Sequence, residues 1–226
     1  MISMTDDRCL IMFIRYPECG QVKSRLAKKL GEEIVVNLYR CFIEDLLERL
    51  ANGAYQFRTA FYPEEKEQEI REMFGRGFSY IPQHGDDLGE RMKDAFIRCF
   101  SERFRSVVVI GSDSPDLPLR IIEESFSALE NHDAVLGPSA DGGYYLIGFR
   151  RESFNPHVFG GLAWGSETVF QETMNIFHTE RALVHVLPVW LDIDRPEDIA
   201  ILLKNNENEG FVHSRTISYL REKGLA

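Results

Sequence analysis

The sequence of 226 residues predicts an α/β fold, in which a mostly parallel, mixed sheet carries helices on both faces. Two continuous apolar runs, at residues 9–14 and 107–110, are typical of strands buried on both faces. Strand and helix patterns alternate around them, as they do in βαβ units. Because no repeat, low-complexity stretch or linker interrupts the chain, residues 1–226 are expected to form a single domain.

The elements follow from periodicity and from the residues that end them. After the strand at 9–14, a loop with Pro17 and Gly20 leads to a short basic helix from about Ser24, which ends near Gly31 because glycine commonly follows a helix. Further strands are expected at 55–61, 78–81, 107–110, 133–136, 144–149 and 182–187, and further helices at 32–51, 64–74, 87–103, 118–130, 166–178 and 212–222. The strand after Gly142 and Gly143 has no helix before it, so the second half is expected to be mixed.

The net charge of −10 argues against nucleic-acid binding, which usually needs a basic surface. Local charge differs, because residues 15–29 contain five basic residues and one acid, Glu18. No apolar run approaches the ~20 residues of a membrane span, and the first residues lack a leader-like pattern. The four cysteines show no zinc or redox spacing and are interpreted as buried, reduced thiols. A cytoplasmic protein is expected, with homo-oligomerisation left open.

The apolar strand at 107–110 ends at Gly111 and is followed by Ser112, Asp113, Ser114, Pro115 and Asp116. A turn at the carboxyl end of a parallel strand faces the binding crevice of α/β proteins. Carboxylate oxygens there suit Mg²⁺ or Mn²⁺, which take one or two acids together with substrate phosphates. Asp113 is the predicted metal ligand, whereas Asp116 is either a second ligand or the N-cap of the next helix.

A basic loop follows the first strand and opens a helix. It contains Arg15, Gly20, Lys23 and Arg25, a set suited to an anion such as a diphosphate or triphosphate. It matches neither a P-loop nor a G-x-G-x-x-G motif. We expect the side chains of Lys23 and Arg25 to be exposed; a solvated basic helix is the alternative.

Three weaker segments complete the candidate site. Asp141 precedes Gly142 and Gly143, where it either forms a turn or lines a sugar or acceptor site. The segment with Asp192 and Asp194 is an ordinary helix start with Pro196, although either acid could be a second metal ligand. Asp87 belongs to a polar loop that either caps a helix or lines one side of a nucleotide site.

The order of six segments resembles the small bacterial nucleotide-diphospho-sugar transferases of the GT-A superfamily, some of which are described as arsenosugar-biosynthesis glycosyltransferases. The fold is also similar to those of molybdenum-cofactor guanylyltransferase and 2-phospholactate guanylyltransferase. The resemblance covers roughly residues 9–203. The segments are FIRYPECGQVKSRL, QHGDDLGERMKDAF, VVVIGSDSPDLP, VLGPSADGGYYLIGF, GLAWGSET and LDIDRPEDI.

The resemblance implies a GT-A-like fold with a Rossmann-like first half, and roles for particular residues. Lys23 and Arg25 match the phosphate-gripping part of the first loop, although Ser24 stands where relatives often have threonine. Asp113 matches the metal-binding acid, and Asp194 stands where related nucleotidyltransferases supply a second ligand. The turn at Asp113 is not a strict Asp-x-Asp, which leaves the second ligand open. Residues 141–143 match the acceptor or sugar side.

The predicted function is metal-dependent transfer of a glycosyl group from a nucleotide-sugar to a small acceptor, with Mg²⁺ or Mn²⁺. The alternatives are a nucleotidyltransferase that uses an NTP and releases pyrophosphate, and a non-catalytic nucleotide-binding regulator. The predicted catalytic residues are Lys23, Arg25, Asp113 and Asp141. Substrate contacts are assigned to Arg15, Gly20, Lys23, Arg25, Asp87, Ser112, Gly142 and Gly143, and metal contacts to Asp113 and Asp194.

Overall fold

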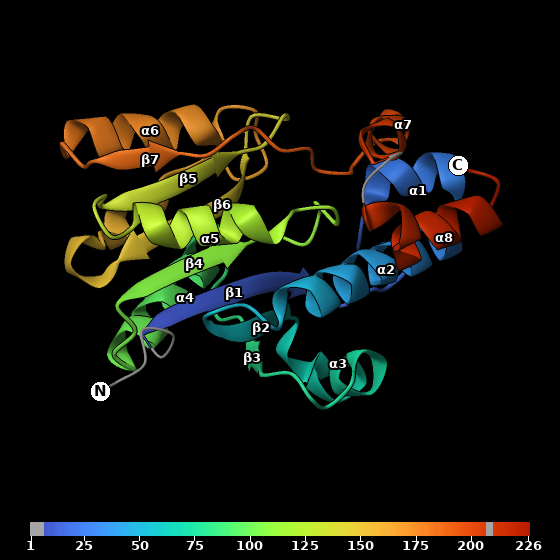
Figure 1. Cartoon of the computed structure of the whole chain (residues 1–226), viewed down its shortest axis with the longest axis horizontal. Helices are drawn as coiled ribbons and strands as arrows, with labels where there is room; N and C mark the ends of the chain where they lie inside the picture. The colour runs from blue at the N-terminus through green and yellow to red at the C-terminus, as the bar shows by residue number, and fades with distance from the viewer. Residues whose placement is uncertain (1–6, 207–209) are drawn as a thin grey trace.

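The computed structural model describes residues 7–206 and 210–226. They contain a seven-stranded sheet with the strand order β3-β2-β1-β4-β6-β5-β7 (Figure 1). All neighbouring strands are parallel except β6, which runs antiparallel to both β4 and β5. The predicted α/β fold with a mostly parallel, mixed sheet is therefore confirmed.

The regular elements follow the predicted alternation closely. The strands are β1 (Arg8–Arg15), β2 (Gln56–Tyr62), β3 (Tyr80–Pro82), β4 (Ser106–Ile110), β5 (Ala134–Pro138), β6 (Tyr144–Arg150) and β7 (Val184–Val186). The α-helices are α1 (Ser24–Leu30), α2 (Glu32–Leu50), α3 (Glu67–Phe74), α4 (Leu88–Ser101), α5 (Leu119–Ala128), α6 (Val169–Thr179), α7 (Pro196–Asn205) and α8 (Arg215–Glu222). Short 3₁₀ helices lie at Glu64–Lys66, Arg151–Ser153, Pro156–Phe159 and Gly210–His213.

Strand β1 lies inside the sheet and is buried on both faces, as its continuous apolar run predicts. Because successive side chains of a strand point to opposite faces, Leu10 and Met12 belong to the cluster that packs under α2 and α5. Cys9 and Ile11 belong to the cluster under α4 and α6. All four side chains are fully buried, and each large apolar side chain buried in this way contributes about 2 kcal/mol. The two clusters make the three-layer arrangement seen in Figure 1.

Several details differ from the sequence-based expectation. The region 64–74 divides into a 3₁₀ turn and α3, and the last helix begins at Arg215 after a 3₁₀ turn.

Asp116 does not cap α5, whose N-cap is Pro118. Its two carboxylate oxygens accept hydrogen bonds instead from Trp190 Nε1 and Asn206 Nδ2, each at 2.9 Å. Asp116 therefore anchors the loop after β7 and the end of α7.

All four thiols are free. All four were expected to be buried, but their exposure differs. Cys9 and Cys99 are buried, Cys41 is intermediate and Cys19 is exposed. Within residues 7–206 and 210–226, no helix is both long and apolar enough to cross a membrane.

Candidate functional site

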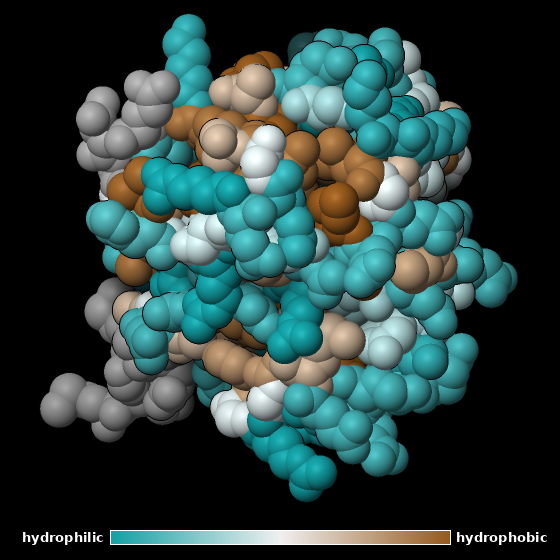
Figure 2. All heavy atoms as spheres, turned by 90° about the vertical axis from the view of Figure 1, so that its right-hand side faces the viewer, coloured by the Kyte–Doolittle hydropathy of each residue, from teal (hydrophilic) through white to brown (hydrophobic). Residues whose placement is uncertain are grey.

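Four loops meet at one edge of the sheet, because the strands before them all point the same way. β1 is parallel to β4 and β5 is parallel to β7, and β6 lies antiparallel between the two pairs. The carboxyl ends of β1, β4, β5 and β7 therefore share one edge, which is where α/β sheets bind ligands. The end of the molecule with α1, α7 and α8 faces the viewer in Figure 2, where hydrophilic residues cover most of the surface and apolar residues gather in the upper part and below the centre.

Backbone hydrogen bonds tie the loop after β7 to the loops after β4 and β5. Ile193 N donates to Asp113 O at 2.9 Å, and Trp190 N donates to Pro138 O at 3.0 Å. Ala140 N in turn donates to Trp190 O at 3.1 Å. These bonds bring Asp192 and Asp194, which are far along the chain, beside the two earlier turns.

Lys23 lies at the centre of this arrangement. Its Nζ is 2.6 Å from Asp113 Oδ1 and 2.8 Å from Asp194 Oδ1, and its side chain is only 4 % exposed. The expectation that this side chain is exposed is therefore wrong, because two acids from distant loops enclose the ammonium group. Burial alone would lower the pKa of Lys23, but the attraction of Asp113 and Asp194 outweighs it and raises the pKa above its usual range.

The backbone of Lys23 is also unusual. It adopts the left-handed conformation, with φ 48° and ψ 46°, directly before α1. Non-glycine residues in this region cost about 1–3 kcal/mol and persist where the surroundings over-determine them. The ion pairs of the side chain are such a determinant.

Asp192 is a further acid close to Asp113, and its side chain is partly buried. Ser114 Oγ donates to Asp192 Oδ1 at 2.6 Å. Burial, followed by repulsion from Asp113, raises the pKa of Asp192 to about 7. This carboxyl group therefore changes its protonation state near neutral pH, unlike an exposed aspartate.

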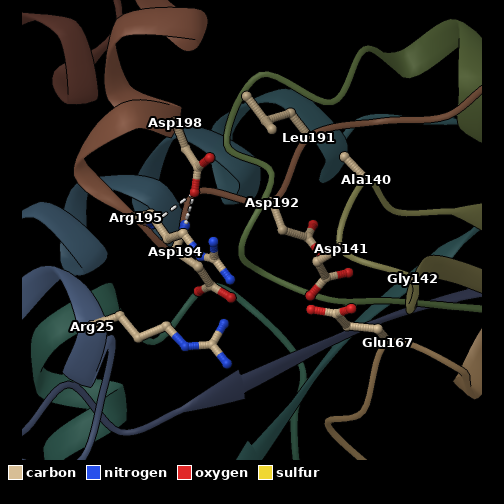
Figure 3. A pocket seen from close by; sticks show the side chains of 10 residues that line it. All are labelled: Arg25, Ala140, Asp141, Gly142, Glu167, Leu191, Asp192, Asp194, Arg195 and Asp198. Atoms are coloured by element: carbon tan, nitrogen blue, oxygen red, sulfur yellow. Dashed lines mark hydrogen bonds between the residues drawn. The ribbon is translucent and has the colours of Figure 1, made fainter.

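Asp198, in the first turn of α7, fixes the position of Asp194. Its Oδ2 accepts hydrogen bonds from the backbone N–H groups of Asp194, at 2.9 Å, and Arg195, at 2.6 Å (Figure 3). The segment is thus a helix start, as its sequence indicates, since Pro196 is the first residue of α7. The same turn holds Asp194 against Lys23. The segment can therefore start a helix and also place Asp194 at the candidate site.

Two adjoining cavities open at this edge. The first has a volume of about 430 Å³ and the second about 270 Å³, and both are lined by Asp141, Asp192 and Asp194. In the first, Arg25 and Arg195 extend their guanidinium groups into the space beside Asp194 (Figure 3). On its opposite wall the carboxylates of Asp141 and Glu167 point toward each other.

The turn at 141–143 behaves as a turn former and also lines the site. Asp141 Oδ1 accepts hydrogen bonds from Ser139 Oγ and from Gly143 N, the latter at 3.0 Å. Gly142 has φ +92°, and a Cβ atom there would lie 2.1 Å from Glu167 O. Only glycine fits that position, because both the backbone conformation and the space exclude a side chain.

The remaining predicted residues take other places. Arg25 is exposed, as expected, and lines the first cavity. Arg15 donates to Gln21 Oε1 at 2.8 Å on the outside of the loop, and Gly20 supplies a turn with φ +72°. Neither of these two residues is among those that line the cavities.

Ser112 and Asp87, both predicted to touch substrate, are engaged in the fold. The Ser112 hydroxyl is buried and shares a 2.7 Å hydrogen bond with Tyr39. The carboxylate of Asp87 caps α4 by accepting from Glu90 N at 2.8 Å. The structure brings neither side chain to the walls of the two cavities.

The lining residues that were not predicted from the sequence include Arg195, Glu167, Asp198 and Trp164. Trp164 and Glu167 lie in or next to the segment of glycines and aromatic residues at 159–165, which was an available signal. Arg195 and Asp198 follow Asp194 in a helix start. Charged residues are common there and do not by themselves indicate a binding site.

The donor set is compatible with a hard divalent cation. The carboxylate oxygens of Asp113 and Asp194 both reach the same Lys23 Nζ, so they lie close enough together to share one cation. Among the described residues, no group of three or more His, Cys, Asp or Glu side chains is arranged to hold a metal. The protein thus offers two carboxylates, which leaves further coordination positions to substrate phosphates and water.

Comparison with known proteins relates the chain to bacterial relatives. A family model described as "Uncharacterized protein conserved in bacteria (DUF2064)" matches residues 46–166. No curated protein sequence matches the chain. A crystal structure from Desulfovibrio desulfuricans G20, described as a "putative nucleotide-diphospho-sugar transferase", is 38 % identical with a TM-score of 0.93, and the match covers 97 % of this chain and 96 % of that one.

Two distant structures share the fold alone. One is CMP:2-keto-3-deoxy-manno-octonic acid synthetase complexed with CTP, with 11 % identity and a TM-score of 0.52 over 89 % of this chain and 99 % of that one. The other is Rv0371c from Mycobacterium tuberculosis H37Rv complexed with manganese, with 16 % identity and a TM-score of 0.51 over 88 % and 98 %.

Proposed function

The chain belongs to the DUF2064 family and to the family of the Desulfovibrio protein, and on this basis we propose that it is a divalent-metal-dependent transferase of a nucleotide-diphosphate substrate. The reaction proposed is transfer of a glycosyl group from a nucleotide-sugar to a small acceptor. The observation that carries the proposal is the convergence of Asp113 and Asp194 on Lys23, beside a cavity into which Arg25 and Arg195 extend.

The first cavity suits the diphosphate. Arg25 and Arg195 are two planar donor groups on one wall, and guanidinium groups bind phosphate oxygens through charge-assisted hydrogen bonds. Lys23, which is paired with the lining residue Asp194, adds a buried ammonium group next to this cavity. In this proposal the three residues stabilise the negative charge that builds up on the departing nucleoside diphosphate.

Asp113 and Asp194 would hold the metal ion, which, when bound, neutralises charge on the diphosphate. The carboxylates presently have Lys23 as their counter-ion. With the metal in that role, the three donors of the ammonium group become available to phosphate oxygens. The manganese complex of the distantly related Rv0371c is consistent with a divalent ion on this fold.

Asp141 is proposed to serve the acceptor. It stands on the wall that separates the two cavities, and its Oδ1 is engaged by Ser139 and Gly143. This engagement orients the carboxylate, so that its other oxygen can accept a hydrogen bond from an acceptor hydroxyl.

A second candidate is nucleotidyl transfer from an NTP with release of pyrophosphate. The cluster of Lys23, Arg25 and Arg195 favours it as much as it favours glycosyl transfer, because pyrophosphate is also an anionic leaving group. In glycosyl transfer the diphosphate leaves as part of a nucleoside diphosphate, whereas in nucleotidyl transfer it leaves as pyrophosphate.

The test is a product assay with Mg²⁺. The protein is incubated separately with radiolabelled NTPs and with nucleotide-sugars, in the presence of a panel of hydroxylic acceptors. Acceptor-dependent release of nucleoside diphosphate supports glycosyl transfer, whereas release of pyrophosphate supports the second candidate. Arg25→Ala should lose turnover, and Lys28→Ala, which changes an exposed residue on the same helix, should retain it. Absence of both products would contradict the proposal.

A further inference from the structure

The second cavity differs in chemical character from the first. Its walls combine aromatic and aliphatic side chains with four carboxylates, and within the described part of the chain no Lys, Arg or His lines it. The first cavity has five acids in its walls, but it also contains two arginines, Arg25 and Arg195. The apolar part of the second cavity consists of Leu88, Tyr144, Tyr145, Trp164 and Val169.

Trp164 is held in place as a rigid wall. A Cβ atom on Gly89, in the first turn of α4, would lie only 2.6 Å from the indole, so the absence of a side chain there allows the ring to pack directly against the helix. Tyr144 meets the same ring edge to face, with centroids 6.2 Å apart and an interplanar angle of 85°. Such a fixed ring gives a ligand a flat apolar surface without the entropy cost of ordering a side chain.

The carboxylates of this cavity already have partners, but each aspartate has two oxygens. Asp113 and Asp194 share Lys23 through their Oδ1 atoms, and Asp141 Oδ1 accepts from Gly143 N. Carboxylates oriented in this way are acceptors for hydroxyl groups, and a few placed polar groups beside an apolar wall are typical of small-molecule sites.

The distribution of charge separates the two ends of a substrate. In the proposed function, the cation at Asp113 and Asp194 is committed to the diphosphate. A further phosphate group in the second cavity would face Asp141 and Asp192 without a lining Lys, Arg or His among the described residues, which costs free energy through repulsion and unsatisfied charge. The diphosphate is assigned to the first cavity, because the two arginines that can bind phosphate oxygens lie there. The occupant of the second must have an apolar face for the indole and an edge of hydrogen-bond donors for the carboxylates.

We propose that the second cavity binds an uncharged, polyhydroxylated ring, with one face of the ring against Trp164 and its hydroxyl groups directed at Asp141. This inference rests on the proposed function, which places a nucleoside diphosphate in the adjoining cavity. The ring belongs either to the sugar of the donor or to the acceptor. Trp164 is in both cases a specificity-determining residue, and phosphorylated rings are excluded.

The experiment uses tryptophan emission, because the chain has two tryptophans. The full-length Trp190→Phe protein retains Trp164 as its sole tryptophan, and Mg²⁺ is used because it does not quench fluorescence. The probes are UDP and GDP, then UDP-glucose and GDP-mannose, and then free glucose or mannose added to each diphosphate complex. Glucose 6-phosphate and glucosamine are the anionic and cationic comparisons. Calorimetry gives the affinities.

We expect UDP or GDP alone to bind without changing Trp164 emission, and to bind Trp164→Ala with unchanged affinity. Addition of the sugar should change the emission. Where the sugar is part of the donor, it should increase the affinity about tenfold, and this gain should be lost in Trp164→Ala and largely kept in Trp164→Phe. A change with the nucleotide-sugar assigns the cavity to the donor, whereas a change only with the free sugar assigns it to the acceptor.

Gly89→Ala is the second variant, because it displaces the indole of Trp164 without replacing any of the residues that line the cavity. It should lose the same gain in affinity while binding the diphosphate normally, with melting curves as the check on folding. The inference is overturned if diphosphate binds but no neutral sugar changes the emission, or if glucose 6-phosphate or glucosamine is preferred to glucose. Failure of any diphosphate to bind would instead contradict the proposed function. The free sugars, added to the protein alone, then test the cavity directly: a change in Trp164 emission supports the inference and no change overturns it.

Discussion

Removal of the Lys23 ammonium group should destabilise the ligand-free protein, although the residue is also assigned to substrate. Lys23→Met keeps most of the aliphatic stem and deletes the charge that Asp113 and Asp194 share. Breaking a fully buried ion pair costs about 3–5 kcal/mol, whereas exposed pairs contribute about 1 kcal/mol or less. The lysine side chain is 4 % exposed, but the acids are 43 % and 33 % exposed and remain partly hydrated. We therefore expect a loss of about 2 kcal/mol, between these limits.

Thermal and urea unfolding at pH 7.5 measure this loss. For a chain of this length, about 2 kcal/mol corresponds to roughly 4–8 °C in Tm. Arg25→Met is the matched control on α1: its side chain is exposed, so a change within about 0.5 kcal/mol is expected. The deficit of Lys23→Met should shrink when Asp113→Asn is combined with it, because one of the two unpaired charges is then absent. Equal stability of Lys23→Met and the natural protein would refute the ion-pair account.

Three further predictions concern the surroundings of the ion pairs. The folded-state pKa of Asp192, about 7, lies above its ordinary value of 3.8, so the stability linked to its protonation is present below pH 4 and lost as the pH rises through 7. Asparagine resembles the protonated acid, so Asp192→Asn should be more stable than the natural protein at pH 8, by up to about 4 kcal/mol. At pH 4 the variant should gain little, and chemical unfolding at both pH values measures the difference. Gly142→Ala should cost at least about 2 kcal/mol, because the new Cβ meets Glu167 O at 2.1 Å at positive φ; an unchanged Tm would contradict this geometry. Asp198→Ala removes the acceptor of two backbone N–H groups, so Asp194 should be misplaced and Mg²⁺-dependent diphosphate binding weakened. Unchanged binding in calorimetry would show that Asp198 acts only on the helix.

Much of the fold could be predicted from the sequence because its strongest signals are local. The apolar runs at 9–14 and 107–110 are long enough, and apolar at enough successive positions, to identify strands buried on both faces. The position of Asp113 follows from the second run, because the carboxyl end of a buried parallel strand fixes where the next turn emerges.

The contacts between loops could not be predicted in the same way. A lysine in a basic loop is ordinarily exposed, and the burial of Lys23 depends on two acids, 90 and 171 residues further along the chain. The same limit applies to Trp164, whose position depends on the glycine at 89. Ser112 stands beside Asp113, the predicted metal ligand, in sequence, but alternation along the extended chain turns its hydroxyl toward Tyr39.

The central claim is that Asp113 couples a divalent ion to nucleotide binding, and calorimetric titration of UDP and GDP with and without Mg²⁺ tests it most directly. The proteins are the natural chain, Asp113→Asn and Asp116→Asn. The last is a control from the same turn, because Asp116 bonds to Trp190 and Asn206, away from Lys23. Mg²⁺ should strengthen diphosphate binding to the natural chain and to Asp116→Asn by about tenfold or more, equivalent to ~1.4 kcal/mol, and should have no effect on Asp113→Asn. The same Mg²⁺-dependent gain in Asp113→Asn would contradict the account.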